Sequence, residues 1–428
     1  MAELKAPRGT ADVLPDESDL WLRVEDVVRQ VCRNAGYGEI RTPIFEHTEL
    51  FERGVGAVTD IVEKEMYTFL DKAGRSITLR PEGTAPCMRA YLEHNLKARP
   101  QPVKMYYIGP MFRYERPQSG RFRQHTQFGV EAIGSADPAL DAEVVSVLVD
   151  VYKRLGLSGF VVHLNSIGCP RCRPRYREAL VNALAGHEEG LCADCRRRLE
   201  RNPLRILDCK NEACREISEG VPTIIEFLCD ECRRHFESVT AYLKALGLAY
   251  EIDHRIVRGL DYYTKTVFEV VHAELGAQDV LGGGGRYDGL AEDLGGEHTP
   301  GVGFAAGIER AVMVLRAARG ESSGEVPETG IRVFVVTMGD AARAEGFKLV
   351  RTLRELGVAS DLDYMGRSLR AQMKHADRCG VRKVVILGEE ELRTGAATVK
   401  DMSTGEQSQT ALEHLAEALS RESRDVTV

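Results

Sequence analysis

Hydrophobic residues recur with two different periods along this chain, and the two periods predict different elements. Between residues 19 and 35 the apolar side chains lie three or four positions apart, which predicts an amphipathic helix that ends before Gly36. Residues 141–155 and 308–318 have the same helical spacing. Elsewhere apolar and polar residues alternate or form short apolar runs, which is typical of strands. These patterns predict strands at 39–46, 76–80, 104–115, 125–131, 160–165 and 265–271.

Two of the predicted strands, 104–115 and 125–131, are joined by a polar stretch that contains Pro117 and Gly120. This order predicts an antiparallel hairpin. Side chains two or four positions apart in a strand face the same way. The hairpin therefore gathers four residues of complementary chemistry on one sheet surface: Arg113, Glu115, Gln127 and Glu131. Arginine can neutralise a phosphate, and carboxylates can bind an amine or an imidazole; the alternative is a solvated face with cross-strand ion pairs.

Two shorter stretches carry polar or unusual residues next to predicted strands. Glu82 and Thr84 follow strand 76–80 and are predicted to lie on one side of an extended segment. Pro43 interrupts strand 39–46 and cannot donate a hydrogen bond to a neighbouring strand. Pro43 therefore belongs on a sheet edge or at an interface, and both a dimer seam and a plain domain edge fit the pattern.

A cation, adjacent phenols and a glycine run occur together between residues 258 and 288. Arg258 precedes Tyr262 and Tyr263, and four consecutive glycines occupy 282–285. Together they suit a small polar substrate and an anion, whereas the alternative is a hairpin with a glycine-rich turn. Arg310, in the first turns of helix 308–318, could reach a phosphate or pair with a carboxylate.

A change of pattern near residue 320 indicates a second domain. Residues 320–330 have the composition of a linker. Strands are then predicted at 331–337, 359–364, 383–387 and 397–401, and helices near 341–356, 369–379 and 410–419. This alternation indicates a small α/β domain. A basic stripe near its second helix would suit an RNA contact or ordinary helix solvation: Arg367, Arg370, Lys374 and Arg378.

Composition narrows the possible classes of protein. A chain of 428 residues has room for two or three domains, and it contains no run of about 18 apolar residues. The first residues lack the apolar core of a secretory signal, so we expect a cytoplasmic protein. A formal net charge of -8 argues against a protein coated with basic residues, but it leaves room for a local basic stripe. One such run, 196–205, could contact a phosphate backbone or form a solvated helix face.

Eight of the eleven cysteines lie between residues 169 and 232 and mark a distinct module. They form four pairs: Cys169 and Cys172, Cys192 and Cys195, Cys209 and Cys214, and Cys229 and Cys232. In a cytosolic chain such pairs favour a metal over disulfides, and four thiolates would bind zinc tetrahedrally. The eight cysteines could close two sites, one site or none, because no spacing identifies which pairs meet. Our hypothesis is that the module binds one structural zinc ion, and the alternative is that it binds none.

The order of these motifs resembles the class II aminoacyl-tRNA synthetases, and among them the histidyl-tRNA synthetase family. The surroundings of Pro43 are similar to motif 1 of the class, which makes the dimer interface. Residues 112–131 are similar to motif 2, and residues 301–310 to motif 3. Three further stretches carry the resemblance to the histidine-specific family: Leu79–Thr84, Arg258–Tyr263 and Gly283–Asp288.

The resemblance implies a role for each matching residue. It implies a histidine pocket formed by Glu82, Thr84, Gln127, Glu131, Tyr262, Tyr263 and Tyr287. Arg113 would bind the α-phosphate of ATP, Glu115 the adenine amino group, and Arg121 and Arg310 the outer phosphates. Arg258 would lie by the α-phosphate, opposite the attacking carboxylate, so that Arg258 and Arg113 are the expected catalytic residues. Magnesium would accompany ATP, and the partners would be L-histidine, tRNA(His) and a second copy of the chain.

The implied fold is α+β, with an antiparallel sheet flanked by helices, a cysteine-rich insertion domain and a C-terminal α/β anticodon-binding domain. The expected boundaries are catalytic core 1–168, insertion 169–250, catalytic core 251–320, linker 321–330 and anticodon-binding domain 331–428. The implied reaction is activation of histidine to histidyl-adenylate, followed by transfer to the 3′ end of tRNA(His). The alternatives are a catalytically inactive regulatory subunit of the kind found with ATP phosphoribosyltransferase and a tRNA-sensing module. The anticodon domain and the complete signature at Arg258 argue against the regulatory subunit. The unbroken set of arginines argues against the tRNA-sensing module.

Overall fold

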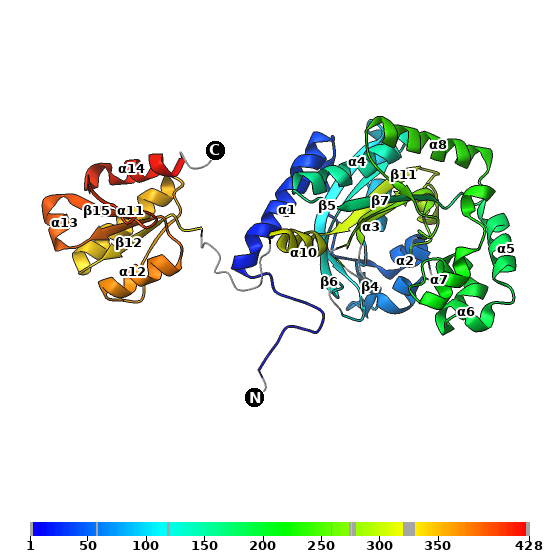
Figure 1. Cartoon of the computed structure of the whole chain (residues 1–428), viewed down its shortest axis with the longest axis horizontal. Helices are drawn as coiled ribbons and strands as arrows, with labels where there is room; N and C mark the ends of the chain where they lie inside the picture. Colours follow the sequence, from blue (N-terminus) through cyan, green and yellow to red (C-terminus); the bar gives the residue numbers. More distant parts are fainter. Residues whose placement is uncertain are drawn as a thin grey trace. The chain divides into compact units, whose positions relative to one another are not determined.

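The chain forms two compact units in the computed structural model, Met1–Glu321 and Ser322–Val428 (Figure 1). The structure describes residues 3–56, 59–117, 120–257, 259–273, 275, 280–319 and 330–424.

The first unit is built on an eight-stranded sheet in the order β1-β5-β6-β11-β10-β9-β7-β8. The five pairings among the six central strands are antiparallel, and the short strand at each edge is parallel to its neighbour. In spatial order the strands are β1 (Gly38–Glu39), β5 (Val103–Phe112), β6 (Gln124–Ile133), β11 (Gly301–Gly307), β10 (Val280–Arg286), β9 (Thr264–His272), β7 (Phe160–Ser166) and β8 (Glu251–Ile252). The predicted antiparallel sheet and the hairpin of residues 104–131 are confirmed.

Helices bury one face of this sheet (Figure 1). The helices are α1 (Pro15–Asn34), α4 (Pro138–Arg154), α8 (Asp230–Ala245) and α10 (Ile308–Arg319). Phe128 and Val130 of β6 and Phe304 of β11 pack into the same core as these helices. Because side chains alternate along a strand, Gln127 and Glu131 face the opposite side of the sheet. The helical layer thus leaves the other face open for a site.

A smaller sheet and several short helices adjoin the large sheet. Its order is β2 (Phe45–His47), β4 (Ser76–Leu79) and β3 (Tyr67–Leu70), and both pairings are antiparallel. Helices α2 (Thr48–Phe51), α3 (Thr84–Glu93) and α9 (Leu290–Asp293) and two π-helical segments, Glu52–Gly56 and Ile61–Glu65, accompany it. A 3-10 turn, Leu96–Ala98, follows α3.

The cysteine-rich segment between β7 and β8 folds as a cluster of helices, drawn in green in Figure 1. They are α5 (Arg173–Leu184), α6 (Ala193–Arg201), α7 (Glu212–Glu219) and α8, joined by 3-10 turns at Glu188–Gly190, Pro203–Ile206 and Ile224–Phe227. Leu180, Leu184 and Ile206 form part of its buried interior, together with one cysteine of each pair.

The second unit has a five-stranded sheet in the order β13-β12-β14-β15-β16, which confirms the predicted α/β domain. The strands are β12 (Val333–Thr337), β13 (Ser360–Leu362), β14 (Lys383–Leu387), β15 (Ala396–Asp401) and β16 (Gln407–Ala411). The helices are α11 (Asp340–Glu355), α12 (Leu369–Arg378), α13 (Glu389–Thr394) and α14 (Leu412–Arg424). The sequence patterns missed α13 and β16 because both are short and largely polar.

The strand predicted at residues 39–46 is wrong. Residues 39–46 do not form one strand, since β1 pairs with β5 in the large sheet and β2 pairs with β4 in the small one. Pro43, which lacks an N–H, lies where the chain passes between the two sheets. The alternative interpretation of residues 282–285 as a glycine-rich turn is also wrong, because this run lies within β10 and pairs with β9 and β11.

Candidate active site

A polar cavity of about 260 Å³ lies on the open face of the large sheet. Nine predicted site residues line it: Glu82, Thr84, Arg113, Glu115, Arg121, Gln127, Tyr262, Tyr263 and Arg310. They come from β6, the N-terminus of α3, the segments that follow β5 and precede β9, and the start of α10. The fold thus assembles residues that are more than 200 positions apart in the sequence, from Glu82 to Arg310.

Two predicted pocket residues, Glu131 and Tyr287, are not among the residues that line the cavity. The Glu131 carboxylate is fully buried and accepts hydrogen bonds from the Tyr287 hydroxyl and, at 2.7 Å, from the Thr84 hydroxyl. Burial raises the pKa of Glu131 to about 8. Glu131 and Tyr287 therefore reach the cavity through Thr84, which lies between them and the open space.

Glu82 helps to form the start of α3. Its carboxylate oxygens accept hydrogen bonds from the backbone N–H groups of Thr84 at 2.6 Å and Ala85 at 2.9 Å. The prediction that Glu82 and Thr84 share one side of an extended segment is wrong, because the helix begins at Thr84. The carboxylate supplies acceptors for N–H groups that have no partner within the helix. Both side chains nevertheless line the cavity.

Three arginines converge at one part of the cavity. Arg113 donates to the carbonyl of Pro81 at 2.9 Å, and Arg310 donates to the carbonyls of Gly120 and Val280. Arg121 forms an ion pair with Glu115. These contacts hold the guanidinium groups in place, which suits them to bind a multiply charged anion.

Residues outside the recognised motif positions also line this part of the cavity, including His125 and Glu309. Burial, together with the charges of Arg113 and Arg310, lowers the pKa of His125 to about 3, so the imidazole is neutral. Burial raises the pKa of Glu309 to about 7. The period of two in β6 places His125 on the same face as Gln127, so the alternation contained a signal for His125.

Three oxygens in the cavity wall are buried without a hydrogen-bond partner in the described part of the chain. One is Glu115 Oε2, which is ion-paired with Arg121, and the other two are Gln127 Oε1 and Glu309 Oε2. A buried polar atom that lacks a partner carries a free-energy cost of about 1–3 kcal/mol, which a bound donor or cation removes. Arg258 lies outside the described residues, and its predicted role stays a prediction.

A second cavity, of about 510 Å³, shares Arg113, Glu115 and Arg121 with the first. Its opposite wall, from α6 and the following turn, carries four arginines together with Asp194 and Asn202: Arg197, Arg198, Arg201 and Arg205. Arg198 lies 3.5 Å from Asp60, and Arg201 lies 3.7 Å from Glu63. The insertion therefore faces the catalytic sheet across this cavity through charged contacts.

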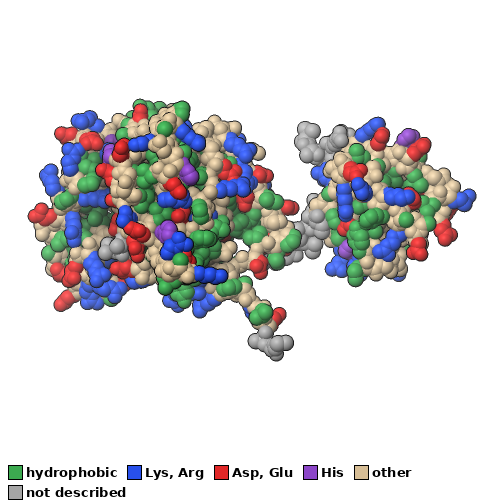
Figure 2. Space-filling view, turned by 180° about the vertical axis from the view of Figure 1, so that it is seen from behind, with side chains coloured by type: hydrophobic (Ala, Val, Ile, Leu, Met, Phe, Trp, Pro, Cys, Tyr) green, Lys and Arg blue, Asp and Glu red, His purple; other side chains and the backbone are tan. Residues whose placement is uncertain are grey.

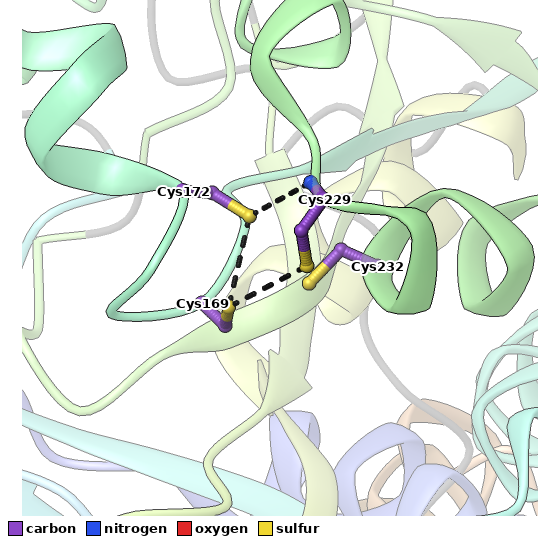
Figure 3. Close-up of side chains that lie close together, drawn as sticks. All are labelled: Cys169, Cys172, Cys229 and Cys232. Atoms are coloured by element: carbon purple, nitrogen blue, oxygen red, sulfur yellow. Dashed lines mark hydrogen bonds between the residues drawn. The ribbon is translucent and has the colours of Figure 1, made fainter.

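The cysteine pairs form two clusters of four. One contains Cys169, Cys172, Cys229 and Cys232 (Figure 3), and the other contains Cys192, Cys195, Cys209 and Cys214. Within each cluster all four sulfurs lie within 4.8 Å of one another. The structure thus assigns the pairs that the spacing left open.

The predicted basic stripe of the second unit is only partly on one helix. Arg370, Lys374 and Arg378 are exposed side chains of α12, whereas Arg367 precedes the helix. Both the backbone N–H and the guanidinium of Arg367 donate to the Asp363 carboxylate. Figure 2 shows acidic and basic side chains interspersed on the face that it draws.

In this chain the antiparallel sheet, with helices on one face and the arginine-lined cavity on the other, has the architecture of the class II aminoacyl-tRNA synthetases. The family "Histidyl-tRNA synthetase" matches residues 9–311, and the family "Anticodon binding domain" matches residues 332–422. The chain belongs to the histidyl-tRNA synthetase family.

Relatives over nearly the whole length agree with this assignment. The chain is 56% identical to a histidine–tRNA ligase of Desulforamulus reducens, over 96% of this chain and 97% of that protein. It is 54% identical to a histidine–tRNA ligase of Halothermothrix orenii, over 98% and 99%. The crystal structure of apo histidyl-tRNA synthetase from S. aureus superposes with a TM-score of 0.81 at 41% identity, and the match covers 98% of this chain and all of that one. No helix in the described part of the chain is long and apolar enough to cross a membrane.

Proposed function

We propose that this chain is a histidine–tRNA ligase that couples L-histidine to ATP and then transfers the histidyl group to the 3′ end of tRNA(His). The observation that carries the proposal is that Arg113 and Arg310 line the same cavity as Glu82, Thr84 and Gln127. The part of the cavity lined by the arginines suits phosphates, and the part lined by Glu82, Thr84 and Gln127 suits a small polar amino acid. Relatives of this length and identity that are named histidine–tRNA ligases support the same activity.

In the first step a carboxylate oxygen of histidine attacks the α-phosphorus of ATP, and the bond to pyrophosphate breaks. Arg113 would bind the α-phosphate, Arg310 and Arg121 the outer phosphates, and Glu115 the adenine amino group. Such displacement needs no protein nucleophile, because positioning and fixed positive charge stabilise the transition state. Arg258 is proposed for the same task on the strength of its motif.

Magnesium would enter with ATP, where it neutralises charge on the phosphates. Mg²⁺ prefers oxygen ligands and is held largely by substrate phosphates. The residue that fits is Glu309, since its buried Oε2 has no hydrogen-bond partner among the described residues. We therefore propose Glu309 as the protein contact of the metal.

Histidine would occupy the part of the cavity that is lined by Glu82, Thr84, Gln127, Tyr262 and Tyr263. The unpartnered Oε1 of Gln127 is an acceptor for the substrate ammonium. Glu82 and the tyrosine hydroxyls would pair with the imidazole nitrogens. A site that pairs both nitrogens rejects amino acids that lack them, because its own polar groups would be left without partners. Glu131 and Tyr287 would support the pocket through Thr84.

The second cavity would receive the 3′ end of the tRNA. It adjoins the first cavity through Arg113, Glu115 and Arg121, and its insertion wall is basic. Residues 169–250 would then be an insertion domain over the acceptor arm, and residues 331–428 an anticodon-binding domain, with Arg370, Lys374 and Arg378 as RNA contacts. The catalytic core would comprise 1–168 and 251–320, with a linker at 321–330. We place this activity in the cytoplasm, where tRNA charging serves protein synthesis.

The experiment that tests the function is histidine-dependent exchange of pyrophosphate into ATP, followed by charging of tRNA(His). We expect both activities in the purified chain. A regulatory subunit or a tRNA-sensing module would bind its ligands without exchange. Absence of exchange with histidine, ATP and magnesium present would therefore overturn the enzymatic proposal.

We also propose that the chain forms a homodimer through the region that contains Pro43. Phe45 of β2 and Phe69 of β3 are exposed, and their pairings with Leu79 and Ile77 of β4 place them on the same face of the small sheet. We expect a variant carrying both Phe45→Asp and Phe69→Asp to sediment as a monomer while the wild type sediments as a dimer. Leu246→Asp, at an exposed position after α8, is the matched control and should remain dimeric.

The pKa of Glu131 predicts a pH dependence of stability. Folding raises this pKa from 4.5 to about 8, so the folded state favours the protonated carboxyl. The contribution of Glu131 to the free energy of unfolding is fully present below pH 4.5 and is lost as pH rises through about 8. The reason is that the Glu131 carboxyl loses its proton at a lower pH in the unfolded chain than in the folded one. We expect Glu131→Gln to show a smaller fall in Tm than the wild type between pH 5 and about 8. Equal slopes in thermal unfolding of the substrate-free proteins would contradict this expectation.

A further inference from the structure

We propose that each cysteine cluster binds one structural zinc ion, so that the chain carries two. The first site consists of Cys169, Cys172, Cys229 and Cys232 (Figure 3), and the second of Cys192, Cys195, Cys209 and Cys214. Neither site overlaps with the cavity proposed for histidine and ATP. The presence of zinc does not depend on the proposed function.

The distances between sulfurs decide between a metal site and a disulfide. Four sulfurs at about 2.3 Å from a central zinc in tetrahedral geometry lie about 3.8 Å from one another. The observed separations are 3.6 Å for Cys169–Cys172, 4.0 Å for Cys169–Cys229 and 3.9 Å for Cys192–Cys209. A disulfide would need about 2.05 Å, and all eight cysteines are free. Four sulfurs in this arrangement suit zinc, and the test below separates zinc from iron.

The surroundings of both clusters favour thiolate charge. Cys172, Cys192 and Cys229 directly precede helices α5, α6 and α8, where the partial positive charge of a helix N-terminus stabilises an anion. Backbone N–H groups also point at sulfur: Cys229 N lies 3.2 Å from the sulfur of Cys172, and Cys192 N lies 3.2 Å from that of Cys214. Such N–H contacts orient metal ligands and offset the net charge of a zinc with four thiolates.

The first site would fasten the insertion to the strand that leads into the histidine pocket. It joins the start of the insertion to a position 60 residues later, at the start of α8. Gly168, next to Cys169, accepts a hydrogen bond from the backbone of Lys265 at 2.8 Å. The Lys265 ammonium lies 3.1 Å from the carboxylate of Glu231, a residue that stands between Cys229 and Cys232 in the sequence. Arg173, next to Cys172, donates to the carbonyl of Tyr263.

The second site lies within the insertion and would position α6 relative to α7. Cys192 and Cys195 are at the start of α6, and Cys214 is in the first turn of α7. The same α6 carries Arg197, Arg198 and Arg201 of the second cavity. This site therefore supports the surface that we propose for the tRNA end, and that part of the inference rests on the proposed function.

Metal analysis of the full-length protein, purified under reducing conditions from zinc-replete cells, tests the proposal. We expect two zinc ions per chain and no stoichiometric iron. The Cys169→Ser/Cys172→Ser and Cys192→Ser/Cys195→Ser variants should each retain one zinc, and Cys379→Ser, outside both clusters, should retain two. Cobalt exchanged into the wild type should show sulfur-to-cobalt charge-transfer absorption for two sites. One metal per chain, none, or iron in place of zinc would overturn the proposal.

Activity assays separate the two sites in variants that stay folded. We expect Cys192→Ser/Cys195→Ser to keep pyrophosphate exchange but to lose about tenfold or more in tRNA charging. We expect Cys169→Ser/Cys172→Ser to raise the KM for histidine in the exchange reaction. If the wild type contained two zinc ions but showed no pyrophosphate exchange, the enzymatic function would be rejected while the zinc proposal would stand. Equal effects of both variants on exchange would overturn the division of roles.

Discussion

Arg113→Ala is expected to reduce histidine-dependent pyrophosphate exchange by about 10²–10³-fold, with little change in the thermal stability of the protein. The guanidinium is held by the carbonyl of Pro81 and lies beside Glu115 in the cavity wall. Its charge is fixed before ATP binds, so no reorganisation is needed when negative charge develops at the α-phosphate. Steady-state exchange with saturating histidine and ATP measures the loss.

Two further variants make this result specific. Arg113→Lys should also lose most of the activity, because an ammonium cannot reproduce the planar, bidentate contact of a guanidinium with phosphate. Arg116→Ala removes a charge three residues away that does not line either of the two cavities of the catalytic unit described above, and it should exchange like the wild type. Near-normal exchange by Arg113→Ala would remove Arg113 from the proposed mechanism.

Gly303→Ala is expected to destabilise the catalytic sheet strongly. Gly303 in β11 pairs directly with Glu131 in β6. A Cβ at this position would lie closer than 3 Å to the buried Glu131 carboxylate and to the carbonyl of Val130. The backbone carbonyl cannot move without breaking the pairing of two strands, so we expect destabilisation by about 3 kcal/mol.

Denaturant unfolding and histidine binding would both report this change. The displaced Glu131 can no longer hold Thr84, so the variant should also bind histidine more weakly. Gly220→Ala is the matched control, since its Cβ would meet no atom within 4 Å and its φ of -94° is open to alanine. Stability of Gly303→Ala equal to that of the Gly220→Ala control would contradict the packing argument.

The sequence was informative about this protein wherever a local pattern reflects a local structure. Helical spacing predicted α4 and α10, and alternation predicted the β5–β6 hairpin. The motif resemblance selected nine residues that line the cavity. Errors arose where a segment is short or changes partner, as at Pro43 and at α13.

Only the tertiary structure decided which distant residues meet. The spacing of the cysteines is the same in three of the four pairs, so it could not show that Cys169 joins Cys229, 60 residues away, while Cys192 joins Cys209. Nor could it show that Glu131 lies behind Thr84, or that His125 and Glu309 share the cavity. The sequence by itself determined most of the longer elements, the order of the catalytic and C-terminal domains and the family, because period and motif are properties of neighbouring residues. The clusters, the burial of Glu131 and the joined cavities depend on packing between distant segments, which no local pattern encodes.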